Sequence, residues 1–261
     1  MRALQIAATG MTAQQLNLDV IANNIANINT TGFKRSRAEF TDLVYAPERL
    51  KGATLTAGGP LVPEGAHVGL GVKPTAVRAI HVQGTLDSTG NRLDVALQGR
   101  GWFPVEGPNG EVLYTRAGSF NTNANGEIVT ADGLLVQPGL TVPAEATAIL
   151  IDRSGLVSAT VAGRAEPEEI GQITLSAFAN ESGLDPLGDN LFRPTAASGD
   201  AVNGLPGDPG FGTLLQGYLE DSNVDAVREI SDMITAQRAY EMNSKVVQAA
   251  DEMMSVTARL R

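Results

Sequence analysis

The amino-acid sequence predicts an α+β fold. Long N- and C-terminal helices are expected to pair as a coiled coil, with a mostly antiparallel β domain and an extended Gly/Pro-rich segment inserted between them. Three observations carry this prediction. Apolar residues recur with heptad spacing near both ends of the chain, as they do in coiled coils. Asn-Gly and Asp-Gly dipeptides separate short apolar runs in the middle, which is a strong signal for β-hairpins. Gly and Pro are frequent between these two patterns.

The N-terminal helix is expected over residues 4–28. When Leu4 is placed at heptad position a, seven of the eight a and d positions are apolar, and Gln14 is the exception. The run ends in asparagines and Gly32, residue types that tolerate the left-handed backbone at which helices stop. The contacts predicted on this helix are Leu4, Met11, Leu18, Ile21 and Ile25.

The C-terminal helix is expected over residues 224–260, because neither Gly nor Pro interrupts this stretch. Ser222 and Asp225 are expected to form a capping box at its start. Two apolar rows flank a middle row of small or polar residues, namely Ala236, Asn243, Ala250 and Thr257. This face is broader than a dimeric seam needs and lets several helices approach, although an ordinary helical bundle is the alternative interpretation. The contacts predicted here are Ile230, Met233, Ile234, Tyr240, Val246, Val247, Met253 and Met254.

The β domain is expected between the helices, over residues 76–221. Four dipeptides predict tight turns between its strands, because each of them contains a Gly, which accepts a positive φ, and because Asn and Asp tolerate one as well. We therefore expect a meander or a small sandwich. Since the chain leaves one helix, builds the sheet and returns to the other helix, the two termini should lie together. The turn dipeptides are Asn109-Gly110, Asn125-Gly126, Asp132-Gly133 and Ser154-Gly155.

Residues 31–75 are expected to connect the helical ends with the β domain. Gly and Pro break the part over 46–74 repeatedly, so that it is predicted to be a loop or an extended hairpin that contacts something outside its own core. Residues 180–213 are rich in Gly, Pro, Asn and Asp and are expected to form a surface excursion. Residues 1–30 and 222–261 would then form one coiled-coil domain.

The composition argues against an enzyme and against a nucleic-acid partner. The 261 residues include 19 Lys and Arg and 29 Asp and Glu, which gives a net charge of −10, whereas phosphate binding needs a surplus of cations. The chain has no Cys, which excludes disulfides, thiolate metal sites and cysteine nucleophiles. Its two histidines, His67 and His81, lack the spacing of metal ligands and are expected at the surface or in packing. We expect no membrane span and no cleaved signal peptide.

Three short patterns suggest chemistry, and each has a simpler interpretation. Residues 121–126 with Asp132 follow the spacing of a calcium loop, but they offer a single carboxylate, and an Asn-Gly hairpin explains them. Residues 99–104 open like a dinucleotide-binding fingerprint, but a Pro replaces the third Gly. The basic cluster at 34–37 is too short for nucleic acid and is expected to form ion pairs. We therefore predict no catalytic residue, no cofactor and no metal site.

Three stretches together resemble the bacterial flagellar rod and hook protein family. The first contains ANNIAN and TGFKR within residues 22–35, the second contains LDVAL, GWF and YTRAGSF within 83–120, and the third contains SNVD and QRAYE within 222–245. They cover both ends and the centre of the chain in the order found in the family. The motif residues are Asn23, Asn24, Asn27, Gly32, Phe33, Lys34, Arg35, Asn223, Gln237, Arg238 and Tyr240.

The resemblance implies a structural subunit that polymerises helically into the hollow rod of the flagellar basal body. Export through the flagellar type III apparatus, without a cleaved signal peptide, is implied as well. The terminal helices would line the inner tube, the β domain would face outward, and residues 31–72 would lie against neighbouring subunits. The implied partners are further copies of the chain, proximal rod proteins below, the hook protein above, and the P- and L-ring proteins between periplasm and outer membrane. Neither nucleic acid nor membrane insertion is implied.

Within the family, the length and the segment over 45–72 most resemble the distal rod members, which form a rigid drive shaft that transmits torque to the hook. A proximal rod member of similar length is the alternative. A phage-tail or adhesin fibre subunit is a second alternative, but it predicts trimeric, Ile-rich seams. A secreted β enzyme or glycan-binding module with helical ends is a third, and it would need a pocket with convergent titratable groups.

Overall fold

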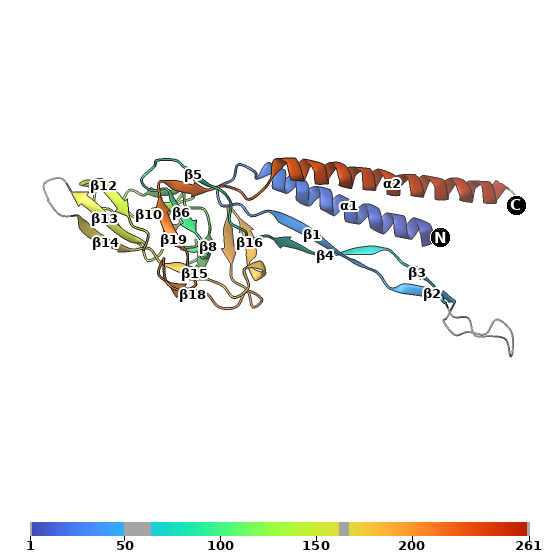
Figure 1. Ribbon diagram of the computed structural model, residues 1–261, viewed down its shortest axis with the longest axis horizontal. Coiled ribbons are helices and arrows are strands. Elements are labelled where there is room, and N and C mark those ends of the chain that lie inside the picture. Colours follow the sequence, from blue (N-terminus) through green and yellow to red (C-terminus); the bar gives the residue numbers. More distant parts are fainter. Residues whose placement is uncertain (1, 50–63, 162–166, 260–261) are drawn as a thin grey trace. The chain divides into compact units, whose positions relative to one another are not determined.

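The computed structural model describes residues 2–49, 64–161 and 167–259 (Figure 1). These residues form two long helices and many short, mostly antiparallel strands. They divide into two compact units, each assembled from segments that are far apart in the sequence. The helical unit comprises Met1–Ile25, Ser36–Arg78 and Asp225–Arg261, and the β unit comprises Ala26–Arg35 and Ala79–Val224. The predicted α+β class with terminal helices is confirmed.

Both helices of the helical unit lie where the heptad patterns predict them. α1 spans Arg2–Ala26, and α2 spans Ala226–Arg259, a run of 34 residues. Figure 1 shows α1 and α2 side by side and running in opposite directions, and a hydrogen bond between Asn24 and Glu229 joins them. Because neither Gly nor Pro interrupts α2, one helix of about 51 Å can form.

Asp225 caps the N-terminus of α2. Its Oδ1 accepts the backbone N–H of Val227 at 2.9 Å and that of Arg228 at 3.2 Å. These N–H groups have no partner within the helix, so the cap stabilises its first turn. The predicted capping box beginning at Ser222 is wrong, because the helix starts only after Asp225. The Ser222 hydroxyl instead accepts the N–H of Val224.

The strands β1 to β4 of the helical unit form two successive strand pairs, which are together called the ribbon below. β1 pairs with β4, and β2 pairs antiparallel with β3. The Gly/Pro-rich stretch predicted over 46–74 contains β3 and parts of β2 and β4, and its residues 50–63 lie outside the described residues. The four strands are β1 (Ser36–Asp42), β2 (Tyr45–Arg49), β3 (Ala66–Gly69) and β4 (Val72–Ala79).

A seven-stranded antiparallel sheet is the largest sheet described in the β unit. Its strand order is β16–β17–β8–β7–β11–β10–β9. These strands are β7 (Phe103–Glu106), β8 (Val112–Thr115), β9 (Phe120–Thr122), β10 (Ile128–Thr130), β11 (Leu135–Val136), β16 (Asp185–Gly188) and β17 (Leu191–Arg193).

Smaller antiparallel sheets complete the β unit. β12, β13 and β14 form a three-stranded sheet, and β15 pairs with β18, β6 with β19, and β5 with β20. A single turn of 3-10 helix, η1 (Glu181–Gly183), precedes β16. The bounds are β5 (Leu86–Ser88), β6 (Val95–Gln98), β12 (Ala146–Ile151), β13 (Leu156–Val161), β14 (Glu168–Gln172), β15 (Leu175–Ala177), β18 (Val202–Gly204), β19 (Thr213–Gln216) and β20 (Tyr218–Glu220).

All four predicted turn dipeptides connect antiparallel neighbours. They join β7 to β8, β9 to β10, β10 to β11 and β12 to β13. Their glycines have φ values between +76° and +83°, a region that other residues enter only with strain. The hairpin at residues 121–132 therefore accounts for the spacing that resembles a calcium loop.

The expectation of a surface excursion over 180–213 is wrong, because this stretch contains η1, β16, β17 and β18. β16 and β17 are joined by the two-residue turn Asp189-Asn190, whose φ values are +51° and +57°. Asp and Asn enter the left-handed region more readily than most residues. The turn signal is therefore present in the sequence, but these strands are too short and too polar to show an apolar pattern.

The buried core of the β unit has two parts. The larger cluster gathers aliphatic side chains and two rings in edge-to-face contact, Phe103 and Phe120, whose centroids are 5.2 Å apart. The smaller cluster is aromatic and is centred on Trp102, which is 1% exposed. Its rings contact edge to face, with Trp102 and Phe192 at 4.8 Å, a favourable geometry for aromatic pairs.

We expect Gly118→Ala to lower the free energy of unfolding of the β unit by about 1–3 kcal/mol, the usual cost of overpacking. A Cβ at Gly118 would lie 1.8 Å from the carbonyl oxygen of Val95, in buried β6, so that strand backbone has to shift. The control is Gly110→Ala, because nothing lies within 4 Å of a Cβ there and only its φ of +76° opposes a side chain. Urea unfolding followed by the fluorescence of Trp102 compares them. Equal losses would contradict the prediction.

Candidate assembly surface

The two helices meet through a row of small or polar side chains on α2. Asn24 Nδ2 lies 3.0 Å from Glu229 Oε2. A Cβ at Gly10 would lie 3.0 Å from Asn243 Nδ2. These two contacts are fourteen residues apart on both helices, as expected for helices that run antiparallel with a seven-residue repeat. The row that faces α1 comprises Glu229, Ala236, Asn243 and Ala250.

The remaining apolar side chains of α2 leave a large exposed surface. Exposed large apolar side chains, where they gather on one element, mark interaction sites in soluble proteins. None of the large apolar side chains described on α1 is exposed to the same degree. Eight exposed ones on α2 are Val227, Ile230, Ile234, Tyr240, Met242, Val246, Met253 and Val256, with 40–79% of their surface accessible.

The predicted contact residues divide into three groups by burial. Ile21 is buried inside the helical unit. The exposed group comprises Ile230, Ile234, Tyr240, Val246 and Met253. The half-buried group comprises Leu4, Met11, Leu18, Ile25, Met233, Val247 and Met254. Sequence reasoning missed Val227, Met242 and Val256, because they lie outside the two apolar rows on which the prediction rests.

Asn24 joins three elements of the helical unit. It is 1% exposed, and its Nδ2 donates to the Ser36 carbonyl at 2.8 Å as well as to Glu229. Its Oδ1 accepts the Ser36 N–H at 2.9 Å. The side chain therefore pairs with the Ser36 peptide groups in both directions, much as a neighbouring strand does. A buried amide requires such partners, because an unpaired one is costly.

A charged cluster is buried in the β unit. Glu220 is 1% exposed and accepts Nζ–H of Lys34 at 2.5 Å and Nε–H of Arg116 at 2.7 Å. It also accepts the Gly84 N–H at 2.9 Å. Arg116 donates further to the carbonyls of Gly99 and Gly101, both at 2.6 Å. All charged groups of the cluster therefore have partners, which a buried ion pair needs. The expectation that the basic cluster at 34–37 forms ion pairs is confirmed for Lys34.

The cluster shifts the pKa values of its members and of a nearby histidine. Burial raises the pKa of the Glu220 carboxyl, but Arg116 and Lys34 together outweigh burial and hold it below its usual value. Burial lowers the pKa of Lys34, and Glu220 only partly offsets this effect. Burial has the largest effect on the pKa of His81, and the positive charges of Lys34 and Arg116 add to it, so that the pKa is lowered to about 4. A hydrogen bond with the Glu181 backbone raises the pKa and offsets part of this shift.

His81 lies after β4 and packs against Trp102 and Phe192 at ring-centroid distances of 5.3 and 6.0 Å. Its Nδ1 has no hydrogen-bond partner among the described residues. Together with its low pKa, this environment favours the neutral ring. His67 lies in β3 and is exposed. His81 is thus a packing residue, as expected.

The family-motif residues have distinct structural roles. Asn223 Oδ1 accepts the Arg35 N–H at 2.7 Å, and its Nδ2 donates to the carbonyls of Ile80 and Val82. Gly32 has a φ of +71° and donates its N–H to the Glu220 carbonyl. The remaining motif residues are exposed or half-buried, namely Asn23, Asn27, Phe33, Gln237, Arg238 and Tyr240.

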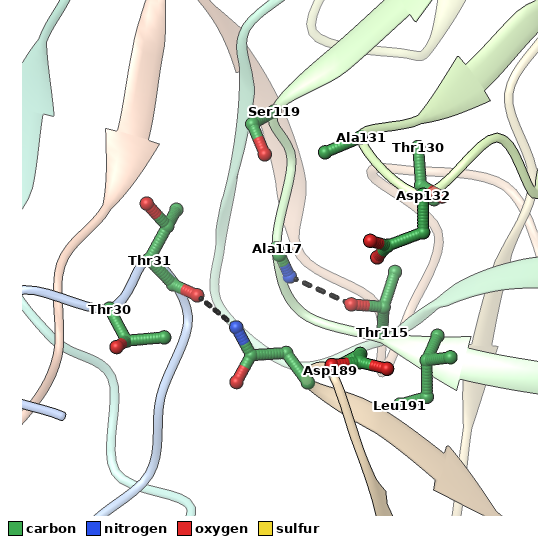
Figure 2. A pocket seen from close by; sticks show the side chains of 11 residues that line it. Thr30, Thr31, Thr115, Ala117, Ser119, Thr130, Ala131, Asp132, Asp189 and Leu191 are labelled. Atoms are coloured by element: carbon green, nitrogen blue, oxygen red, sulfur yellow. Dashed lines mark hydrogen bonds between the residues drawn. The ribbon is translucent and has the colours of Figure 1, made fainter.

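The β unit also contains a polar cavity of about 230 Å³, shown in Figure 2. The Asn190 side chain, which lines the cavity, donates to the Thr31 carbonyl at 3.0 Å. Its titratable lining residues are Asp132 and Asp189, both exposed. Such a lining offers hydrogen bonds but no nucleophile paired with a base. The hydroxyl-bearing lining residues are Thr30, Thr31, Thr115, Ser119 and Thr130.

Among the described residues, no three His, Asp or Glu side chains lie close enough together to hold a metal ion. No helix in the described part of the chain is long and apolar enough to cross a membrane.

Three family models match the chain, and they cover both helices and the centre. The model for the flagella basal body rod protein matches residues 4–34. That for the flagellar hook protein FlgE/F/G D1 domain matches residues 96–159, and that for the flagellar basal body rod FlgEFG protein C-terminal matches residues 215–260.

Curated relatives match over nearly the whole length. The flagellar basal-body rod protein FlgG of Agrobacterium fabrum is 60% identical over 99% of both chains. The protein of the same name from Caulobacter vibrioides is 56% identical over 100% of both. The flagellar basal-body rod protein FlgF of Caulobacter vibrioides is 34% identical, over 96% of this chain and 94% of its own.

Proposed function

The chain belongs to the flagellar basal-body rod protein family, and from this premise we propose that it is a subunit of the distal rod. Two relatives named FlgG are 60% and 56% identical to it, whereas a relative named FlgF is 34% identical, which favours the distal over the proximal rod. The family is structural and not enzymatic. The proposed role is to polymerise into a rigid hollow shaft that transmits torque from motor to hook.

One observation carries this proposal, namely the exposed apolar surface of α2. Eight large apolar side chains along one helix remain exposed in the single chain, and burying them against further copies provides a driving force for polymerisation. We propose that a surface other than α2 of the neighbouring copy receives them, so that the contact is heterologous. Such contacts build helical assemblies when the rotation between copies does not close a ring. In this proposal α1 and α2 form the coiled-coil domain of residues 1–30 and 222–261 that lines the inner tube.

The distribution of charge supports this arrangement. The helical unit carries 11 basic and 11 acidic residues, whereas the β unit carries 8 basic and 18 acidic residues, so that the whole net charge of −10 resides in the β unit. A neutral unit can pack closely against its copies without the self-repulsion that net charge causes. We therefore place the β domain, residues 76–221, on the outside of the rod.

The ribbon is the proposed second contact between subunits. Val44, Tyr45 and Val77 are at least half exposed there, and apolar side chains on a two-stranded ribbon have little core of their own to enter. We propose that the connecting segment, residues 31–75, lies extended against neighbouring subunits. This segment includes the Gly/Pro-rich residues that lie outside the described part of the chain.

The cellular setting follows from the family. We propose that the chain is exported through the flagellar type III apparatus without a cleaved signal peptide and is built into the basal body between periplasm and outer membrane. Its proposed partners are its own copies, the proximal rod proteins below, the hook protein above, and the surrounding P- and L-ring proteins. Electron microscopy of purified hook–basal bodies that contain a labelled chain tests this placement, and label outside the rod would refute it.

We expect the double variant Val246→Asp, Met253→Asp to lose polymerisation. Both side chains are exposed in the single chain, at 48% and 62%, so that the charges cost little there but would be buried in the polymer, where each is expensive. The control places the same charges on exposed polar positions of α2, as Gln248→Asp, Ser255→Asp. Electron microscopy counts polymers, and circular dichroism checks that both variants keep their helices. Rods built by the first variant would contradict the assignment of this face.

A further inference from the structure

We propose that Asn24 is a positioning residue that fixes the ribbon alongside α1. Among the described residues, polar contacts join the ribbon to the helix at three places. Ser36, the first residue of β1, pairs with Asn24. The Val72 N–H donates to Thr9 Oγ1 at 3.3 Å, and Arg2 forms an ion pair with Glu48. These contacts follow α1 from its last turn to its first, so that the ribbon lies along the length of the helix.

The three contacts differ greatly in burial. Arg2 and Glu48 are about half exposed, and exposed ion pairs of this kind contribute little. The bond from Val72 to Thr9 is a single hydrogen bond at 3.3 Å, near the limit for N–H···O geometry. Asn24, by contrast, is 1% exposed. It is therefore the firmest of the three attachments.

The bonding of Asn24 links the ribbon to both helices at once. One Nδ2 hydrogen is bound by the Ser36 carbonyl and the other by Glu229 Oε2, while Oδ1 accepts the Ser36 N–H. Glu229 is 0% exposed and belongs to the row of α2 that faces α1. The amide thus fixes the point at which β1 begins relative to the helix pair. Neither an aspartate nor an aliphatic side chain can replace all three bonds.

A close approach further along the helix requires the ribbon to be held in place. A Cβ at Gly71 would lie 2.2 Å from Thr9 Oγ1 and 3.3 Å from Thr9 Cβ. Gly71 also accepts the Leu43 N–H through its carbonyl, which joins both strands of the ribbon here. We infer that the ribbon reaches this contact because Asn24 anchors its first residue. This inference rests on the proposed function only in its consequence, which is that Asn24 determines how the ribbon is presented to neighbouring copies.

Engineered disulfides test the inference, because the natural chain has no Cys. The ribbon reporter is Thr9→Cys with Gly71→Cys, whose Cβ atoms would lie 3.3 Å apart, just below the disulfide range of about 3.5–4.5 Å. The φ of +118° at Gly71 strains this reporter equally in every variant that carries it. The helix reporter is Gly10→Cys with Asn243→Cys, at the contact between α1 and α2. In the full chain we expect Asn24→Ala to slow formation of the ribbon disulfide at least tenfold and to leave the helix disulfide within twofold. Gln15→Ala, at an exposed position of α1, should change neither rate.

A reciprocal exchange separates positioning from general stability. Asn24→Asp places two carboxylates side by side and should slow the ribbon disulfide as Asn24→Ala does. Adding Glu229→Gln restores a donor opposite the new carboxylate, but the Ser36 carbonyl still lacks the donor that Asn24 supplies. The ribbon rate should therefore recover only in part and stay at least threefold below that of the parent. The inference is overturned if Asn24→Ala leaves the ribbon rate unchanged, if both disulfides slow equally, or if Glu229→Gln restores the full parent rate, because the bond to the Ser36 carbonyl would then not matter. These rates are measured on the unpolymerised chain, so that polymerisation, scored separately by electron microscopy, tests the proposed function independently.

Discussion

Replacing Glu220 by Ala is expected to lower the free energy of unfolding of the β unit by about 3–5 kcal/mol, the usual cost of breaking a buried ion pair from one side. The substitution leaves Lys34 and Arg116 buried next to each other without the carboxylate that accepts from both. It also removes the acceptor of the Gly84 N–H. Urea unfolding followed by the fluorescence of Trp102, the single Trp of the chain, measures the loss.

The control for this prediction is Glu106→Ala, which removes the same charge from an exposed position of the same unit. Its effect should stay below about 0.5 kcal/mol, as for most surface substitutions. Because the pKa of Glu220 is lower in the folded chain than its ordinary value, its stabilisation is fully present above the unfolded pKa. It is lost as the pH falls through the folded pKa. Comparable losses in Glu220→Ala and Glu106→Ala would show that the cluster does not stabilise the unit.

Acidification from pH 6.5 to about 4 is expected to cost the β unit up to about 3 kcal/mol through His81 alone. Its pKa is about 4 in the folded chain against 6.5 for an ordinary His, and each pKa unit corresponds to about 1.4 kcal/mol. Over this range the unfolded chain binds a proton that the folded chain does not, so stability falls as the pH falls. The groups facing the ring are Lys34, Arg116, the Glu181 backbone, Trp102 and Phe192, and none of them offers a compensating negative side chain.

The variant His81→Phe keeps a ring in this aromatic pocket and removes the titration. Unfolding curves recorded at several pH values between 4 and 7 should therefore be flatter for His81→Phe than for the parent. His67→Phe is the control, since His67 is exposed in β3 and its replacement should leave the pH dependence unchanged. A parent chain whose stability is constant across this range would refute the prediction.

Local patterns were sufficient to predict both long helices and the hairpins at the four turn dipeptides. The heptad repeats predicted α1 and α2 because a helix of this length presents the same face many times, so that single exceptions such as Gln14 matter little. The Asn-Gly and Asp-Gly turns predicted their hairpins because the left-handed backbone there restricts the residues that fit. By contrast, β16 and β17 are three or four residues long, too short for period-two alternation to be recognised.

Contacts between distant parts of the sequence could not be predicted in this way. Lys34, Arg116 and Glu220 are separated by up to 186 positions, and no spacing rule brings them together. The role of Asn24 was equally hidden, because a motif identifies a residue without stating its partners. The exposed face of α2 was predicted in its apolar rows, whereas the burial of Ile21 depends on packing within the helical unit. The proposed contacts between subunits remain predictions for the experiments above.

The discontinuous construction of the helical unit has a consequence for the order in which the chain can fold. A chain that emerges with its N-terminus first delivers α1 long before α2, and the Asn24–Glu229 bond spans 205 positions. Apart from its short segment Ala26–Arg35, the β unit is one continuous stretch, Ala79–Val224. This stretch can fold as soon as it emerges, whereas contacts of such high sequence separation form late. The apolar face of α2 is therefore the last surface to be delivered. When the chain emerges N-terminus first, the assembly surface is therefore completed only after almost the whole subunit has emerged.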